Sequence, residues 1–129
     1  MKFDIITIFP EIFTSYFAES LLARAQKKKL IEINIHNLRD WTCDLHKTVD
    51  DAPFGGGAGM VMKIEPLYKS IKSIKSKVKS LGIKTILLSA KGKTWNQRLV
   101  KAHSKLNNII LICGRYEGVD ERIVKFIDE

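Results

Sequence analysis

Short apolar runs alternate with segments of helical periodicity along this chain, and the alternation constrains its fold more than any other feature. Apolar runs occupy residues 3–8, 85–88 and 108–113, and residues 30–36 alternate isoleucine with polar side chains. Apolar residues recur at helical spacing through residues 10–23, 65–79, 96–103 and 119–127. Because parallel strands need crossover connections, the alternation predicts an α/β fold with a parallel sheet and helices on both faces.

The first predicted helix begins at Pro10 and runs through Ala23. Its apolar residues are expected to share one face: Ile12, Phe13, Tyr16, Phe17 and Leu21. Such a stripe is more often buried than open to solvent, so we expect these aromatic rings in the core rather than on a base-stacking surface. A similar apolar stripe in residues 65–79 has lysines on its opposite face.

Composition limits the class of protein. The 129 residues, 45% of them hydrophobic, are enough for one globular domain spanning residues 1–129. No apolar run approaches the roughly 18 residues of a membrane-spanning helix, and the N-terminus lacks a secretory pattern, so we expect a cytoplasmic protein. The two cysteines, Cys43 and Cys113, lack the spacing of a disulfide framework and are interpreted as reduced thiols.

Positive charge is concentrated in one stretch of the chain. The sequence has 22 Lys plus Arg against 14 Asp plus Glu, a formal net charge of +8. Between Lys63 and Lys105 there are twelve basic residues and one acidic residue, Glu65. This stretch is typical of a protein with a polyanionic partner such as RNA, although a solvated lysine-rich helix has the same composition.

The segment Asp50–Met60 (DDAPFGGGAGM) contains four of the chain's eight glycines: Gly55, Gly56, Gly57 and Gly59. Backbone without Cβ atoms can approach a ligand closely. The segment is not a Walker A loop, since no Gly-Lys-Ser/Thr follows, and it is not a dinucleotide fingerprint, since Met60 occupies the third glycine position. A mobile loop and an anion-binding nest both remain open as interpretations.

Two further loops directly follow predicted strands. Residues 113–122 (CGRYEGVDER) follow one apolar run, and residues 89–93 follow another. Ligands of open α/β sheets bind beyond the carboxyl ends of the strands, so the two loops predict one shared pocket. The alternative is an ordinary turn, in which Asp120 caps the next helix and Arg122 pairs with a nearby carboxylate.

Together these motifs closely resemble the bacterial tRNA (guanine-N1)-methyltransferase family, which modifies the position 3′ to the anticodon. The resemblance rests on residues Arg39–Thr42, Asp44, His46, Thr48–Met60 and Gly114–Arg122. It extends from the predicted strand near Phe3 to Glu129. The shorter segment Leu88–Gly92 fits with one departure, because the family usually has proline where this chain has Ala90.

The resemblance implies a trefoil-knot methyltransferase fold, S-adenosyl-L-methionine as the cofactor, tRNA as a partner, and a homodimer whose two chains share each active site. It assigns cofactor-side loops to Ser89, Ala90, Gly92, Gly114, Tyr116 and Glu117. It assigns an RNA-facing role to Asp50, Gly55, Gly56, Gly57 and Gly59, and we expect His46 to make a loop hydrogen bond or to contact RNA. Glu117 and Arg115 take the catalytic roles, with Glu117 organising the guanine or the methyl donor.

The family continues beyond the segment that corresponds to Glu129. That continuation holds the third cofactor loop, which completes the knot, then a linker with the general base and a helical tRNA-binding domain. We therefore expect these 129 residues to be the N-terminal part of the enzyme, with the knot incomplete and no methyl transfer by this chain alone.

Two other classes of function are compatible with the residues. A non-catalytic RNA-binding module would use the basic stretch and no cofactor, whereas a phosphate-binding or small-molecule-binding α/β protein would use the glycine loop as an anion nest. We expect no metal site, because Cys43, Asp44 and His46 match no zinc pattern and a zinc site needs three or four convergent donors.

Overall fold

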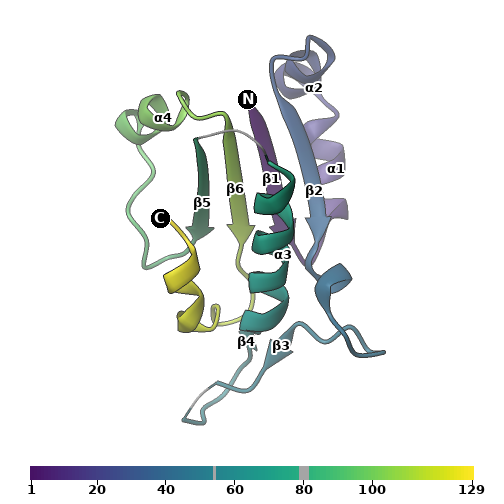
Figure 1. Ribbon diagram of the computed structural model, residues 1–129, viewed down its shortest axis with the longest axis vertical. Helices are drawn as coiled ribbons and strands as arrows, with labels where there is room; N and C mark the ends of the chain where they lie inside the picture. The colour runs from purple at the N-terminus through teal and green to yellow at the C-terminus, as the bar shows by residue number, and fades with distance from the viewer. Residues whose placement is uncertain (54, 79–81) are drawn as a thin grey trace.

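A four-stranded parallel sheet forms the centre of the molecule (Figure 1). The computed structural model describes residues 1–53, 55–78 and 82–129. In the spatial order β2-β1-β6-β5, the strands are β2 (Glu32–Asn37), β1 (Lys2–Thr7), β6 (Asn108–Cys113) and β5 (Ile83–Leu88). Every neighbouring pair is parallel, which confirms the predicted α/β class and the four predicted strands.

One face of the sheet packs against helix α3 (Ile64–Lys77). Buried side chains of the helix join buried isoleucines of β1 and β6 in one apolar cluster: Leu67, Ile71, Ile74, Ile6, Ile110 and Ile112. The same cluster includes Leu38 of the 3-10 helix η1 (Leu38–Trp41). The periodicity of residues 65–79 therefore predicted this helix, although its last predicted residue, Lys79, lies outside the described residues.

Helices α1 (Glu11–Phe17) and α2 (Ser20–Lys27) lie on the other face, beside β2 (Figure 1). Phe17 of α1 and Ala23 of α2 line a shallow pocket together with Ile35 of β2. Ile35 is in register with Ile5 of β1, and the next residue of β1, Ile6, faces α3. Because successive side chains of a strand point to opposite faces, Ile5 and Ile35 face away from α3. The predicted placement of helices on both faces is thereby confirmed.

The prediction of one continuous helix through Ala23 is wrong. The helix breaks at residues 18–19, and Ser20 has a φ of +50°. The predicted aromatic core is wrong as well, because the half-buried side of α1 carries Phe13 and Phe17, and Ile12 and Tyr16 lie on its exposed side. Ile12, Tyr16 and Leu21 are 65%, 70% and 71% exposed. Neither helix contains a buried residue.

The segment expected to be a helix at residues 119–127 is instead a 3-10 helix, η2 (Glu121–Phe126). After it the chain turns back and runs beside β5, where Asp128 N donates to Thr85 O at 2.9 Å and Leu87 N donates to Glu129 O at 2.8 Å. The chain can return to β5 because η2 ends at Phe126. The expected helix before β6 is present as α4 (Gln97–His103), which Asn96 caps by accepting from Leu99 N.

The basic residues between Lys63 and Lys105 that the structure describes are divided among several elements. Most of them lie on α3, β5 and α4. Figure 1 shows α3 over the centre of the sheet and α4 near the amino-terminal ends of β5 and β6. Within the described ranges, no helix combines the length and the apolar character that a membrane span requires.

Candidate functional site

The glycine-rich segment forms a hairpin at the carboxyl end of the sheet (Figure 1). Strand β3 (Asp50–Asp51) pairs antiparallel with β4 (Val61–Met62), and residues 52–60 connect them. Within that loop Gly55, Gly56, Gly57 and Gly59 all have φ between +81° and +124°, which residues with a Cβ rarely adopt. Phe54, in the same loop, lies outside the described residues.

Backbone hydrogen bonds join this hairpin to the segment Gly114–Arg122. Glu117 N donates to Met60 O at 3.2 Å, Met62 N donates to Gly118 O at 3.0 Å, and Asp120 N donates to Met62 O at 3.0 Å. Met62 is fully buried, and its Sδ lies 3.2 Å from Arg115 N. The two longest motifs of the sequence therefore meet at one place, with the glycine loop anchored at its C-terminal end.

The side chain of Glu117 strengthens the same contact. Its Oε2 accepts a hydrogen bond from Met60 N at 2.7 Å. A Cβ on Gly59 would lie within 2.5 Å of both carboxylate oxygens, so a glycine is required there for Glu117 to keep this position. An ionised carboxylate has about four acceptor positions, and the bond from Met60 uses one of them. The remaining positions can accept N–H groups of a ligand.

The two strand-end loops begin side by side. Leu88, the last residue of β5, is in register with Cys113, the last residue of β6. The first loop closes as a turn in which Gly92 N donates to Ser89 O at 3.0 Å, and a Cβ on Gly114 would lie 3.4 Å from Leu88 O. The structure thus brings together the first residues of the loops that the sequence assigned to one pocket. Burial raises the pKa of the Cys113 thiol, which therefore stays neutral at pH 7.

Arg115 projects toward β1 rather than along the hairpin. Its Cζ lies 5.3 Å from the centre of the exposed Phe9 ring, a cation–π geometry. Tyr116, the next residue, is 41% exposed and has a φ of +60°. Both side chains of the predicted site are therefore open to a ligand on the surface.

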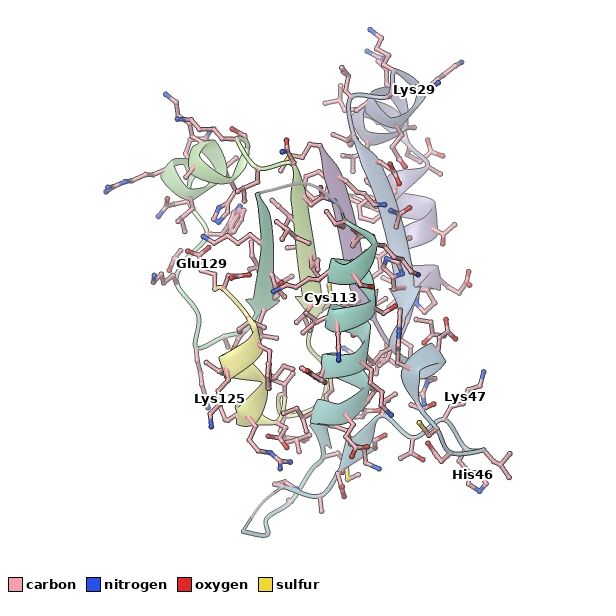
Figure 2. The ribbon with its side chains drawn as sticks, viewed as in Figure 1. Lys29, His46, Lys47, Cys113, Lys125 and Glu129 are labelled. Carbon is pink, nitrogen blue, oxygen red and sulfur yellow. The ribbon has the colours of Figure 1, made fainter. Side chains whose placement is uncertain are left out.

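His46 is exposed at the outer end of the loop 42–48 (Figure 2). This loop and the glycine hairpin project from the same end of the molecule (Figure 1). Asp44 closes the loop, because its carboxylate accepts from Thr48 Oγ1 at 2.6 Å and from Thr48 N at 3.0 Å. These hydrogen bonds hold the pKa of Asp44 below its ordinary value.

Cys43, weighed with Asp44 and His46 as a metal ligand, contacts helix α3. Its Sγ lies 3.0 Å from Lys69 Nζ, and this hydrogen bond raises the pKa of the lysine. In the part of the chain that the structure describes, no group of three or more His, Cys, Asp or Glu side chains is placed to hold a metal ion.

Asp120 caps η2 and pairs with Arg122, as the turn alternative predicted. Its Oδ1 accepts from Arg122 N at 3.0 Å, and its Oδ2 lies 2.5 Å from Arg122 Nη2. The guanidinium holds the pKa of this carboxyl below its ordinary value. A cavity of about 300 Å³ beside the pair is also lined by Asp51 of β3 and Glu65 of α3.

The sequence did not indicate that Asp51 and Glu65 would line a common cavity. Asp51 was seen only as part of the glycine motif, and Glu65 only as the acidic exception in a basic stretch. They come together with Asp120 because β4 pairs with the Gly114–Arg122 segment and leads directly into α3. A pattern along the sequence cannot show that pairing.

Comparison with known proteins then identifies the family. The family model described as tRNA (Guanine-1)-methyltransferase TrmD matches residues 1–129. The chain belongs to this family. Similar members include the tRNA (guanine-N(1)-)-methyltransferase of Dictyoglomus turgidum, 52% identical over 127 residues, which are 98% of this chain and 50% of the relative. That of Clostridioides difficile is 50% identical over 127 residues, which are 98% of this chain and 55% of the relative.

A solved structure of the TrmD family has the same fold. The crystal structure of tRNA (m1G37) methyltransferase from Aquifex aeolicus matches with a TM-score of 0.88 and 37% identity, over 100% of this chain and 57% of that chain. The resemblance predicted from the two long motifs is therefore confirmed. The chain spans about half the length of the TrmD family members that it matches.

Proposed function

We propose that this chain is the N-terminal, cofactor-binding part of an enzyme that transfers a methyl group from S-adenosyl-L-methionine to N1 of the guanine 3′ to the anticodon in tRNA. The observation that carries the proposal is the contact between Glu117 and Met60, which joins the glycine hairpin to the loop that follows β6. The names of relatives that are about half identical to this chain support the reaction.

The cofactor would be held by Ser89, Ala90, Gly92, Gly114 and Tyr116, inside a trefoil knot. Three features support this assignment. The two loops start from neighbouring strands, the backbone at Gly114 lies close to Leu88 O, and the Tyr116 ring is exposed for apolar contact. When bound, S-adenosyl-L-methionine supplies an electrophilic methyl group. The Glu117 carboxylate suits the neighbourhood of its cationic sulfonium.

Glu117 would position the guanine. Guanine N1 carries a proton at neutral pH, which must leave when the methyl group is added. After its bond with Met60 N, the carboxylate retains positions that can accept an N–H of the base. Holding the base in line with the methyl donor would raise the rate, because it places the two reactants in the geometry that the transfer needs. Arg115, exposed two residues before Glu117, would neutralise charge on the RNA.

The RNA would approach the end of the molecule where the two long loops project. The hairpin presents Gly55, Gly56, Gly57 and Gly59 with exposed backbone, Asp50 begins β3, and His46 is exposed on the neighbouring loop (Figure 2). Backbone N–H groups without neighbouring side chains are suitable donors to phosphate oxygens.

The enzyme would act as a homodimer in the cytoplasm, where its tRNA substrate is found. The exposed apolar residues of α1 and α2 support the dimer, because Ile12, Tyr16 and Leu21 are each at least 65% exposed on one side of the sheet. Large apolar side chains that are exposed on one side of a protein are a common feature of protein interfaces.

The product of the reaction tests the proposal. The full-length protein is incubated with S-adenosyl-L-methionine and a tRNA transcript that has guanine 3′ to the anticodon, and the digested nucleosides are analysed by mass spectrometry. We expect 1-methylguanosine, and none from a transcript with adenine at that position. Binding of tRNA without any methylated product would contradict the proposal and favour a non-catalytic RNA-binding module.

A further inference from the structure

A groove between α3 and η2 lies outside the residues assigned to methyl transfer. It has a volume of about 600 Å³, and its walls come from both elements. The residues that matter for its chemistry are Tyr68, Lys72 and Lys75 of α3 and Lys125 and Phe126 of η2. Figure 1 shows the two elements next to each other on the α3 side of the sheet, and Figure 2 labels Lys125.

Two aromatic rings meet across the groove. The centroids of Tyr68 and Phe126 are 4.7 Å apart, and the ring planes are tilted by 59°. The residues remain 38% and 40% exposed, so the contact leaves ring surface open to solvent. An exposed aromatic surface beside positive charge is the usual platform on which a protein stacks an unpaired base.

The charges around the rings are mainly positive. Lys72 Nζ lies 6.0 Å from the centre of the Tyr68 ring, and Lys72 and Lys125 are both exposed. Lys75 Nζ lies 3.7 Å from Asp128 Oδ2, the carboxylate that also lines the groove. Three lysines against one aspartate give the groove an excess of positive charge, which complements a phosphate backbone better than a neutral or acidic surface does.

The groove and the cavity beside Asp120 are lined by the same two elements, α3 and η2. Glu65 in the first turn of α3 and Arg122 in η2 line the cavity beside Asp120. Tyr68 lies one helical turn further along α3, and Lys125 lies three residues further along η2. A strand of RNA that leaves the hairpin end of the molecule can therefore follow the two elements into the groove.

We propose that this groove binds the RNA strand next to the methylated nucleotide, with Lys72 and Lys125 contacting phosphates and the Tyr68 and Phe126 rings stacking against an unpaired base. The proposal rests on the proposed function in one respect, because it takes tRNA as the substrate. It assigns RNA recognition to Tyr68, Lys72, Lys125 and Phe126, which lie outside the motifs at residues 39–60 and 114–122.

Direct measurement of tRNA affinity tests the charged part of the proposal. Fluorescence anisotropy with the full-length protein and a labelled tRNA transcript gives the slope of log affinity against log salt concentration. Replacing Lys72→Gln together with Lys125→Gln should reduce the magnitude of this slope by about 1.4–1.8, since each lost phosphate contact contributes about 0.7–0.9. The matched control, Lys28→Gln with Lys29→Gln, removes the same charge at the opposite end of the molecule (Figure 2) and should change the slope less.

The aromatic part has its own variant. Phe126→Leu keeps an apolar side chain against Tyr68 but removes the ring, and it should weaken tRNA binding about 5-fold or more with an unchanged melting temperature. The KM for tRNA in methyl transfer should rise in the same variants, and kcat should stay close to that of the wild type.

Three outcomes separate the groove from the wider function. A salt slope and affinity equal to those of the control overturn the groove proposal even when methyl transfer is normal. Altered sedimentation of the protein with unchanged tRNA affinity also overturns it and makes the groove a protein interface. If the wild type binds tRNA but forms no 1-methylguanosine, the proposed function fails, while the salt slope still decides whether the groove binds RNA.

Discussion

Replacing Gly59 with alanine tests whether Glu117 holds the two motifs together in solution. Gly59 has a φ of +97°, and this backbone conformation costs a residue with a Cβ about 1–3 kcal/mol. The new Cβ would also lie within 2.5 Å of both Glu117 carboxylate oxygens, so the carboxylate would have to leave Met60 N. Because this hydrogen bond is exposed, its net loss adds about 1 kcal/mol. We expect Gly59→Ala to lower the free energy of unfolding by about 2–4 kcal/mol.

Gly57→Ala is the matched control. Gly57 has a φ of +124° and so pays a comparable backbone cost, but among the described residues nothing lies within 4 Å of its added Cβ. In urea titrations followed by circular dichroism, Gly59→Ala should be less stable than Gly57→Ala by about 1 kcal/mol. The difference should vanish when both are combined with Glu117→Ala. Equal losses in the two single variants would refute the contact.

Three further predictions concern other contacts. Met62→Ala should lower the free energy of unfolding by about 2–5 kcal/mol because Met62 is fully buried, whereas Met60→Ala, at a side chain 36% exposed, should cost less than about 1 kcal/mol in the same urea titration. Burial raises the pKa of Asp4, but hydrogen bonds, led by that from His36, outweigh it and leave the pKa below the ordinary 3.8. As the pH falls, Asp4 is therefore protonated in the unfolded chain before it is protonated in the folded chain. The free energy of unfolding should fall between about pH 5 and pH 3, and Asp4→Asn should make this fall smaller in urea titrations. Arg115→Lys should reduce methyl transfer by the full-length protein, since an ammonium does not stack as a planar guanidinium does, and an unchanged kcat/KM would exclude Arg115 from the site.

The sheet and α3 could be predicted because each depends on a local pattern. β-Branched runs such as residues 108–113 become buried parallel strands, and the stripe of Leu67, Ile71 and Ile74 becomes the buried face of a helix. The stripe of Ile12, Tyr16 and Leu21 misled the same reasoning. The half-buried side of α1 carries Phe13 and Phe17 instead, and the break at residues 18–19 places Leu21 on a separate helix.

The sequence indicated the candidate residues of the site, but it did not indicate the contacts that bring them together. The motifs around Gly59 and Glu117 were each apparent in the sequence, yet 57 residues separate Met60 from Glu117. The bonds that join them involve mostly backbone atoms, which carry no residue-specific signal. The same limit applies to Tyr68 and Phe126, since their contact depends on where η2 packs against α3.

The central claim is that Glu117, held by Met60, acts on the reacting groups of a methyltransferase site. Glu117→Gln keeps the shape of the side chain and removes its charge, and Glu32→Gln is a matched change at an exposed carboxylate on β2. In the full-length protein, single-turnover methyl transfer to tRNA is measured beside calorimetric titration with S-adenosyl-L-methionine. The account predicts that Glu117→Gln reduces methyl transfer by more than it reduces cofactor affinity, with Glu32→Gln close to the wild type in both. Equal losses would make Glu117 a cofactor-binding residue only, and unchanged methyl transfer would contradict the claim.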